Sequence, residues 1–191
     1  MMALEEMKIL ICWNWSSRKG KRTKVPIGAS GCTPETSEEY SCTWVTKAEA
    51  EKAAADKGSS GIGFVLPEGF FFLDIDKREL DDPFGQMMLE RFDSYAEISV
   101  SGSGIHIYGR CDMSRLPTYI DKAGKTRLNQ EFYMKASNDV ELYFGGITNR
   151  FAVFTGNAIR DVPLCDCTEA LLDTLDKDMR RKPKAKRAVS L

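Results

Sequence analysis

Two acidic residues stand two positions apart at the end of an apolar run, in the segment FFFLDID. Alternate residues of a β-strand point to the same face, so Asp74 and Asp76 would project together while Leu73 and Ile75 project into a core. Neighbouring carboxylates repel each other unless a cation lies between them, and Mg²⁺ prefers carboxylate oxygens. The pair predicts a divalent metal site, although a solvated strand end with two acids gives the same pattern.

The single histidine of the chain, His106, lies in the segment IHIYG. It excludes sites that need two histidines, such as an HExxH zinc site. His106 and Tyr108 would share one face of a strand. The preceding Ser-Gly-Ser-Gly turn, which includes Ser103 and Gly104, has the composition of a loop that aims N–H groups and hydroxyls at an anion. His106 would then add a ring N–H to a phosphate oxygen, while the simpler alternative is a hairpin turn beside a half-exposed histidine.

Glu141 is a third carboxylate on a predicted strand, flanked by Val140 and Leu142 in VELY. Alone, it would be an ordinary surface glutamate. Together the three segments predict one design, in which three strands of one sheet each present a polar group on the same face. Three carboxylates suit two divalent cations that stabilise the attacking and leaving oxygens at phosphorus. The histidine and the Ser-Gly turn would hold a triphosphate.

The elements that must position these residues are short strands and inserted helices, which predict an α+β domain around a largely antiparallel central sheet. Thr46 with Glu49 forms a capping-box pattern before the helix KAEAEKAAADK, which Gly58 should end. Further helices are expected over 79–94 and 168–181. MKILICW has the composition of a buried strand, and the polar residues 16–42 predict a long loop. Three β-hairpins are expected: 61–66 with 70–76, 95–100 with 105–110, and 139–144 with 150–156.

Lys and Arg number 27 against 28 Asp and Glu, which excludes a uniformly basic nucleic-acid-binding surface. The bases gather at the ends, in residues 1–30 and 177–187. We therefore expect a catalytic domain over 1–176 and a basic tail or linker over 177–191. No signal-peptide pattern or membrane-spanning apolar run is present, so a cytoplasmic location without a membrane partner is expected. Six cysteines without a CxxC pair predict reduced, mostly buried thiols, with a zinc-binding appendage as the alternative.

The order LDIDK, EISVSGSGIHIYGR, VELYF and RFAVFTG resembles the primase-polymerase (prim-pol) domain of phage and plasmid replication proteins, in the archaeo-eukaryotic primase superfamily. RTKVPI, TWVTKAEA and GIGFVL also fit that family, and the resemblance spans roughly residues 10–158. It implies an α/β prim-pol fold with an RRM-like unit, flanking helices and a second α/β unit, the active site lying between the units.

The resemblance also implies a template-directed nucleotidyltransferase, a DNA primase and DNA polymerase of phage or plasmid-type replication. Asp74, Asp76 and Glu141 match the metal-binding acids, which implies a two-metal site for Mg²⁺ or Mn²⁺. His106 and Ser103 match the nucleotide-binding motif. The partners implied are single-stranded DNA template and primer, a dNTP or NTP, and a helicase or accessory DNA-binding domain.

Further basic residues are expected to meet a triphosphate or template phosphate, because Lys and Arg supply this in phosphoryl transfer. They are Lys24 in RTKVPI, Arg110 after the histidine strand, and Arg150 before FAVFTG. Each would otherwise be a solvated cation at a loop or strand end. Three tryptophans, Trp13, Trp15 and Trp44, either stack on a base or pack in the core.

Two other functions remain open at the level of sequence. One is a non-catalytic nucleic-acid or nucleotide-binding module of a replication protein, which would keep the sheet and lose turnover. The other is a metal-dependent nucleotide-sugar transferase that uses Asp74 and Asp76. That chemistry has no need for the Ser-Gly turn with His106 or for the strand acid Glu141.

Overall fold

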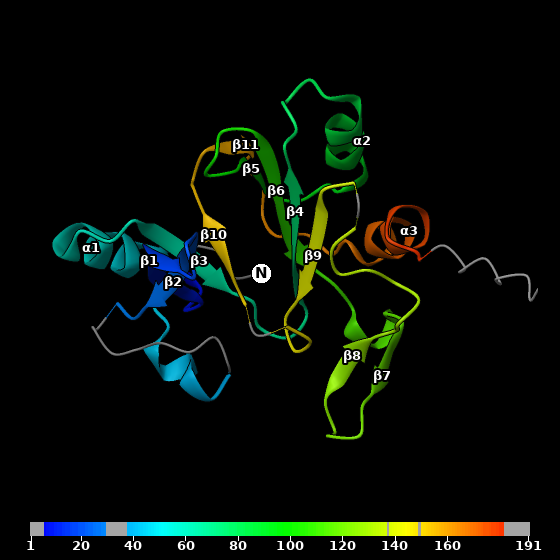
Figure 1. Ribbon diagram of the computed structural model, residues 1–191, viewed down its shortest axis with the longest axis horizontal. Helices are drawn as coiled ribbons and strands as arrows, with labels where there is room; N and C mark the ends of the chain where they lie inside the picture. The colour runs from blue at the N-terminus through cyan, green and yellow to red at the C-terminus, as the bar shows by residue number, and fades with distance from the viewer. Residues whose placement is uncertain (1–5, 30–37, 137, 149, 182–191) are drawn as a thin grey trace, which may run out of the picture.

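Two antiparallel β-sheets lie side by side in the computed structural model, which describes residues 6–29, 38–136, 138–148 and 150–181 (Figure 1). Sheet A has the strand order β10-β3-β1-β2 and sheet B the order β11-β5-β6-β4-β9. The strands of sheet A are β1 (Leu10–Arg18), β2 (Lys21–Ile27), β3 (Gly61–Val65) and β10 (Phe151–Phe154). The strands of sheet B are β4 (Phe70–Asp76), β5 (Ala96–Ile98), β6 (Gly104–Arg110), β9 (Val140–Phe144) and β11 (Ala158–Arg160).

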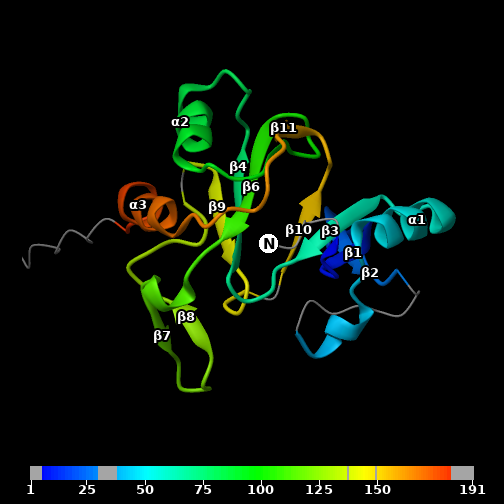
Figure 2. The same ribbon diagram turned by 180° about the vertical axis from the view of Figure 1, so that it is seen from behind.

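The two faces of sheet B have different partners, as the two-residue period of its strands requires. One face carries the apolar residues Leu73, Ile75, Ile105, Ile107 and Leu142, all fully buried. They pack with residues of α2 (Pro83–Arg91) and α3 (Thr168–Asp178) in one core cluster. Both helices lie on the side of sheet B away from sheet A in the two opposite views (Figure 2). The alternate residues of the same strands therefore face sheet A.

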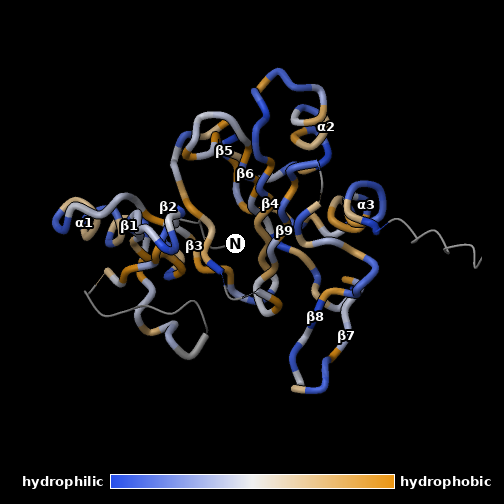
Figure 3. Tube along the Cα trace, viewed as in Figure 1, coloured by the Kyte–Doolittle hydropathy of each residue, from blue (hydrophilic) through white to orange (hydrophobic). Residues whose placement is uncertain are grey.

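A second core cluster joins the two sheets. It includes Leu10, Phe64 and Phe154 from sheet A and Phe72 and Tyr108 from sheet B. Hydrophobic residues accordingly gather on the facing strands, whereas the small hairpin β7 (Thr118–Ile120) and β8 (Thr126–Leu128) projects as a mainly hydrophilic arm (Figure 3). The α+β class and the antiparallel pairing predicted from the sequence are confirmed.

Helix α1 (Lys47–Lys57) forms as predicted, because its ends carry their own capping groups. Glu49 donates its backbone N–H to the Thr46 hydroxyl and accepts the N–H of Thr46 at 2.9 Å, which completes the capping box. Gly58 ends the helix in a left-handed conformation. Helix α3 is also confirmed. Helix α2 is shorter than the predicted 79–94, because Asp82 caps its N-terminus and Pro83 fills its first position.

The prediction of a long loop over 16–42 is wrong. β1 continues to Arg18 and pairs with β2 through a turn at Lys19 and Gly20, and a 3-10 helix follows at Glu38–Thr43. The outer half of this hairpin is exposed on both faces, so it has no apolar alternation that would identify a strand. The predicted loop over 30–37 lies outside the described residues.

Two of the three predicted hairpins are also wrong. β3 and β4 follow each other across a turn at Pro67, but β3 lies in sheet A and β4 in sheet B. β9 and β10 are divided in the same way, with β9 in sheet B and β10 in sheet A. A local turn signal marks where the chain reverses, and it does not determine which strand is the hydrogen-bonded neighbour. The hairpin of β5 and β6 is confirmed.

Two chain segments cross between the sheets, one from β3 to β4 and one from β9 to β10, and they touch each other. The N–H of Gly145, after β9, donates to the carbonyl of Phe70 at 2.9 Å. A side chain on Gly145 would begin 1.8 Å from the carbonyl oxygen of Pro67. The absence of a side chain at residue 145 therefore lets both links pass between the sheets at the same place.

The chain after α3 continues to pack on the body. Arg180 lies over the ring of Phe132 at 4.8 Å, and the N–H of Arg181 donates to the carbonyl of Glu131 at 2.7 Å. The remainder of the predicted basic tail, from residue 182, lies outside the described residues. Of the five cysteines described, Cys12, Cys111 and Cys167 are buried, while Cys32 lies outside that part. No helix in the described ranges is long and apolar enough to cross a bilayer.

We expect Gly145→Ala to lower the free energy of unfolding by at least about 2 kcal/mol, because the new methyl group meets backbone atoms that cannot turn away. Gly124→Ala is the control, since Gly124 has open space and only its φ of 74° to disfavour alanine, worth about 1 kcal/mol. Urea unfolding measures both. Equal losses in the two variants would contradict the tight contact at Gly145.

Candidate active site

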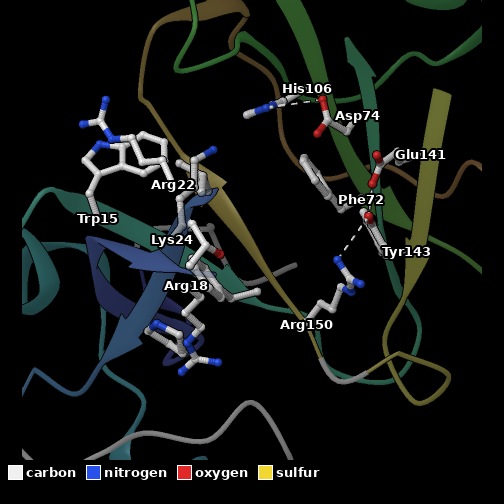
Figure 4. Close-up of a pocket in the computed structure, with 14 residues that line it drawn as sticks. Trp15, Arg18, Arg22, Lys24, Phe72, Asp74, His106, Glu141, Tyr143 and Arg150 are labelled. Carbon is white, nitrogen blue, oxygen red and sulfur yellow. Dashed lines mark hydrogen bonds and ion pairs between the residues drawn. The ribbon is translucent and has the colours of Figure 1, made fainter. Parts of the chain in front are cut away.

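A cleft of about 660 Å³ lies between the two sheets and has an acidic and a basic wall (Figure 4). Sheet B contributes Asp74, His106 and Glu141, together with the rings of Phe72 and Tyr143. The opposite wall and the rim are lined by Trp15, Arg18, Arg22, Thr23, Lys24, Pro26, Arg150, Phe151 and Val153. Cations and anions therefore face each other across an open space.

The acidic wall is a single row across three neighbouring strands. Asp74 on β4 is the register partner of His106 on β6 and of Glu141 on β9. Directly opposed residues of an antiparallel pair point to the same face, with Cβ atoms about 5 Å apart. The sequence-based expectation that these three side chains share one face of one sheet is confirmed.

Asp74 is a largely buried carboxylate in the middle of the row that faces the cleft. Its Oδ1 is buried and has no hydrogen-bond partner in the described structure, and it lies 3.7 Å from His106 Nε2. Burial raises the pKa of Asp74, and the neighbouring His106 partly opposes this rise. One carboxylate oxygen of the row thus has no protein donor among the described residues.

His106 is held from behind by Glu97, a fully buried carboxylate that the sequence reading did not single out. His106 Nδ1 lies 3.1 Å from Glu97 Oε1, so the ring donates from Nδ1 and turns Nε2 toward Asp74. The same carboxylate accepts the backbone N–H groups of Thr155 and Gly156, each at 2.9 Å. One carboxylate thereby connects the histidine to the segment that follows β10.

Two tyrosine hydroxyls complete the surroundings of Glu97. Tyr95 lies 3.2 Å and Tyr108 3.1 Å from its carboxylate oxygens. Burial, followed by the charge of Glu97, raises the pKa of both tyrosines, so both hydroxyls keep their protons and serve as donors. No spacing motif marks Glu97; its position in YAEIS, with a polar residue inside an apolar strand, was the available signal.

Glu141 has protein partners on the exposed side of the cleft. Lys135 forms an ion pair with it, and the Tyr143 hydroxyl donates to it. Arg150 in turn lies over the Tyr143 ring at 5.1 Å, with its guanidinium 3.5 Å from the hydroxyl oxygen. Arg150 and Glu141 are therefore linked through one aromatic side chain, and Arg150 lines the cleft as the sequence led us to expect.

Lys24 lies on the opposite wall, on β2, and its charge faces the acids. Burial lowers the pKa of Lys24, while Asp74 and then Asp76 act in the opposite direction. Its ammonium group lies 5.5 Å from the centre of the Trp15 ring. Arg18 and Arg22 line the same wall, and the sequence reading had passed over both because they lie in the segment predicted as loop.

Four other predicted residues do not line this cleft. Asp76 ends β4 as the register partner of Gly104, outside the lining. Ser103 lies in the turn, where its carbonyl accepts the N–H of Lys77 at 3.1 Å. Arg110 lies at the far end of β6, beside Asp166. Gly104 is buried, and a Cβ there would lie 2.9 Å from the carbonyl oxygen of Ile75, which requires glycine.

Metal binding was expected at Asp74, Asp76 and Glu141. Within the described ranges, no group of three or more His, Cys, Asp and Glu residues is close enough to hold an ion. The unpartnered Oδ1 of Asp74 is the one feature of the row that fits a cation directly. The donor set is thus present on one face but is not assembled into a metal site.

The three tryptophans differ in their surroundings. Trp13 and Trp44 are buried, and Trp13 donates its indole N–H to the carbonyl of Ile62 at 3.0 Å. Core packing, the alternative to base stacking, therefore describes these two. Trp15 is half-buried and lines the cleft, with Arg22 lying over its ring at 4.0 Å.

The fold and site define an α+β protein with a cleft between two sheets, one wall acidic and the other basic. No family model matches the chain. It is 27% identical over 146 residues to a protein named DNA primase-polymerase from Nitratiruptor phage NrS-1, a match that covers 73% of this chain. The chain spans 18% of that relative's length. The match supports a distant relationship to a phage primase-polymerase.

We expect Glu97→Ala to lower the free energy of unfolding by about 3 kcal/mol or more. It leaves the Tyr95 hydroxyl, the His106 ring N–H and two backbone N–H groups without this acceptor, and each such group costs about 1–3 kcal/mol. Tyr108 keeps the carbonyl of Val153 as an acceptor. Glu51→Ala is the control, since that side chain is 56% exposed. Calorimetry compares the two. A small loss in Glu97→Ala would show that solvent replaces the carboxylate.

Asp74→Asn should raise the melting temperature at pH 7 in buffer containing EDTA. The pKa of Asp74 is raised by folding, so the carboxylate favours the folded state when protonated and opposes it when ionised. The gain should disappear as the pH falls below the pKa of an unfolded aspartate, about 4. Melting curves from pH 3 to pH 8 test this, and a gain that does not depend on pH would contradict the assigned cause.

Proposed function

We propose that this chain is the nucleotidyltransferase unit of a DNA primase-polymerase, which joins a nucleotide to a 3′-hydroxyl on a DNA template. The row Asp74–His106–Glu141, facing Lys24 and Arg150 across the cleft, is the observation that carries the proposal. The distant relative from phage NrS-1 supports it, since that protein is named for this activity.

The basic wall and His106 suit the triphosphate. Lys24 and Arg150 would offset phosphate charge, and a partly desolvated cation does so more strongly than one in water. His106 has its Nδ1 held by Glu97, so its Nε2 is turned toward the cleft, where an N–H at that atom would donate to a phosphate oxygen. Glu97 thereby fixes the orientation of the ring rather than touching the nucleotide.

The acidic row suits a divalent metal. Asp74, with its unpartnered Oδ1, would hold Mg²⁺ or Mn²⁺ together with Glu141 and Asp76. When bound, such ions neutralise developing charge on the phosphate and lower the pKa of a coordinated hydroxyl. Lys135 is 66% exposed, and an exposed ion pair contributes about 0–1 kcal/mol. The pair with Lys135 is therefore a small obstacle to the use of Glu141.

The reaction is a displacement at the α-phosphorus. A bond forms between the primer 3′-oxygen and phosphorus, the bond from phosphorus to the bridging oxygen breaks, and pyrophosphate leaves with that electron pair. The hydroxyl proton passes to solvent. This chain's residues contribute by holding the triphosphate against Lys24, Arg150 and His106 and by placing the carboxylates beside the reacting oxygens.

Primer extension on a DNA template with Mg²⁺ or Mn²⁺ tests the proposal. We expect the Asp74→Ala/Asp76→Ala double variant to extend a labelled primer at least about 100-fold more slowly, because the site loses its charge for the cation. Asp56→Ala/Asp81→Ala removes two exposed carboxylates and should extend at the normal rate.

Binding measured on the same proteins separates the alternatives. Full activity of the Asp74→Ala/Asp76→Ala variant would overturn the proposed site. If the unmodified chain binds a nucleotide and DNA but never extends a primer, it is a non-catalytic binding module instead.

A further inference from the structure

The hairpin of β1 and β2 concentrates positive charge. Five bases lie within seven residues: Arg18, Lys19, Lys21, Arg22 and Lys24. Residues 7–29 contain no Asp or Glu. Among the described residues none of these five bases forms an ion pair. The hairpin therefore presents cations that no protein carboxylate neutralises at close range.

One face of the hairpin combines this charge with an aromatic ring. Trp15 and Lys24 are register partners, and Ser17 pairs with Arg22 one step nearer the tip. The Arg22 guanidinium lies over the Trp15 ring at 4.0 Å, and Trp15 meets Trp13 edge to face, with ring centres 5.2 Å apart. Trp13 is fixed in the core, so Trp15 is a supported ring at the margin of the cleft.

The bases extend beyond the acidic row. Arg18, Arg22 and Lys24 line the cleft, whereas Lys19 and Lys21 are exposed at the tip and lie outside its lining. Lys21 lies three residues before Lys24 on the strand, which corresponds to a span of about 10 Å. β2 is an edge of sheet A, and no other strand of the described residues pairs with its outer side. The charge thus extends from the cleft to the tip of the hairpin, with Arg22 and Lys24 on the face of Trp15 and Lys21 on the other face.

We propose that the β1–β2 hairpin is a binding surface for single-stranded DNA. A nucleobase stacks on Trp15, and successive phosphates contact the Lys and Arg side chains of the hairpin. The inference rests on the proposed function, because it assigns the template strand to this wall of the cleft. Aromatic rings beside a basic track are the features by which proteins bind single strands without reading sequence. Arg22 then lies against the base as it now lies against Trp15.

The spacing of the charges favours a polymer over a free nucleotide. A triphosphate is compact and meets Lys24 and Arg150 beside the acids, which leaves Lys19 and Lys21 unused. A polymer with regularly spaced phosphates can contact all of the basic side chains of the hairpin. An acidic peptide would match the charge but would not require the half-buried ring of Trp15, so the contribution of that ring separates the two partners.

The first experiment measures binding of a fluorescein-labelled oligo(dT) by anisotropy, without nucleotide or metal, over a range of salt concentrations. Log affinity falls as log salt concentration rises, and the Arg18→Gln/Lys21→Gln variant should make this fall less steep by about 1.4, since each lost phosphate contact removes about 0.7 from the slope. The matched control is Lys122→Gln/Lys125→Gln on the β7–β8 arm, which also removes two exposed bases. An unchanged slope in the β1–β2 variant, or an equal change in the control, would overturn the proposal.

The second experiment tests the ring. Trp13 and Trp44 are buried, so quenching of tryptophan fluorescence by oligo(dT) should come from Trp15 and disappear in Trp15→Phe. Trp15→Ala should weaken oligo(dT) binding roughly 10-fold, and Trp15→Phe should weaken it less. Quenching by dTTP but not by oligo(dT) would place a free nucleotide at Trp15 and contradict the proposal, as would unchanged affinity in Trp15→Ala.

The two proposals fail in different ways. If oligo(dT) binds at the hairpin and no primer is extended, the hairpin assignment stands and the nucleotidyltransferase activity fails. If primers are extended while the hairpin variants bind oligo(dT) normally, the activity stands and the assignment of the template strand fails.

Discussion

The buried carboxylate of Glu97 is the interaction on which the arrangement of the cleft depends. A buried carboxylate is costly unless donors surround it, and here five groups fill that role: His106, Tyr95, Tyr108 and the N–H groups of Thr155 and Gly156. Glu97 lies on β5, and its donors come from Tyr95 just before β5, from β6 and from the segment after β10. Satisfying one carboxylate therefore aligns the histidine, two strands of sheet B and the end of a strand from sheet A.

The two-residue period of the sheet B strands separates stability from chemistry. Leu73, Ile75 and Ile107 face α2 and α3, where burial of apolar surface supports the fold. The intervening Asp74 and His106 face the cleft, where burial of a charged group opposes folding. This burial raises the pKa of Asp74. A strand can thus place an unfavourable charge because its neighbours along the chain supply the free energy on the other face.

Local patterns in the sequence predicted the parts of the fold that depend on local physics. The capping box of α1, the strand faces of β4, β6 and β9, and the shared row of Asp74, His106 and Glu141 all follow from capping and alternation. Sheet membership depends on long-range pairing, so the expected hairpins of β3 with β4 and β9 with β10 were wrong. The β1–β2 hairpin was missed because its exposed residues carry charge on both faces.

Glu97 shows a different limit of sequence reading. Its role comes from five donors, four of them nine or more residues away along the chain, and no spacing rule predicts such a set. Arg18 and Arg22 were passed over for a related reason, since their role depends on the sheet that carries them. Glu97, Arg18 and Arg22 are identified by the residues that the fold brings next to them and not by their residue type.

Strand β10 is fastened to sheet B at both of its ends. Before Phe151, the N–H of Gly145 donates to the carbonyl of Phe70 on β4, and after Phe154, Thr155 and Gly156 donate to Glu97. A wall anchored at two points keeps its distance from the acidic row, so the width of the cleft is set before any ligand arrives. Pre-organisation of this kind lowers the entropy lost on binding. Adaptation to ligands of different size then falls to the outer edge of sheet A, where β2 pairs only with β1 among the described strands.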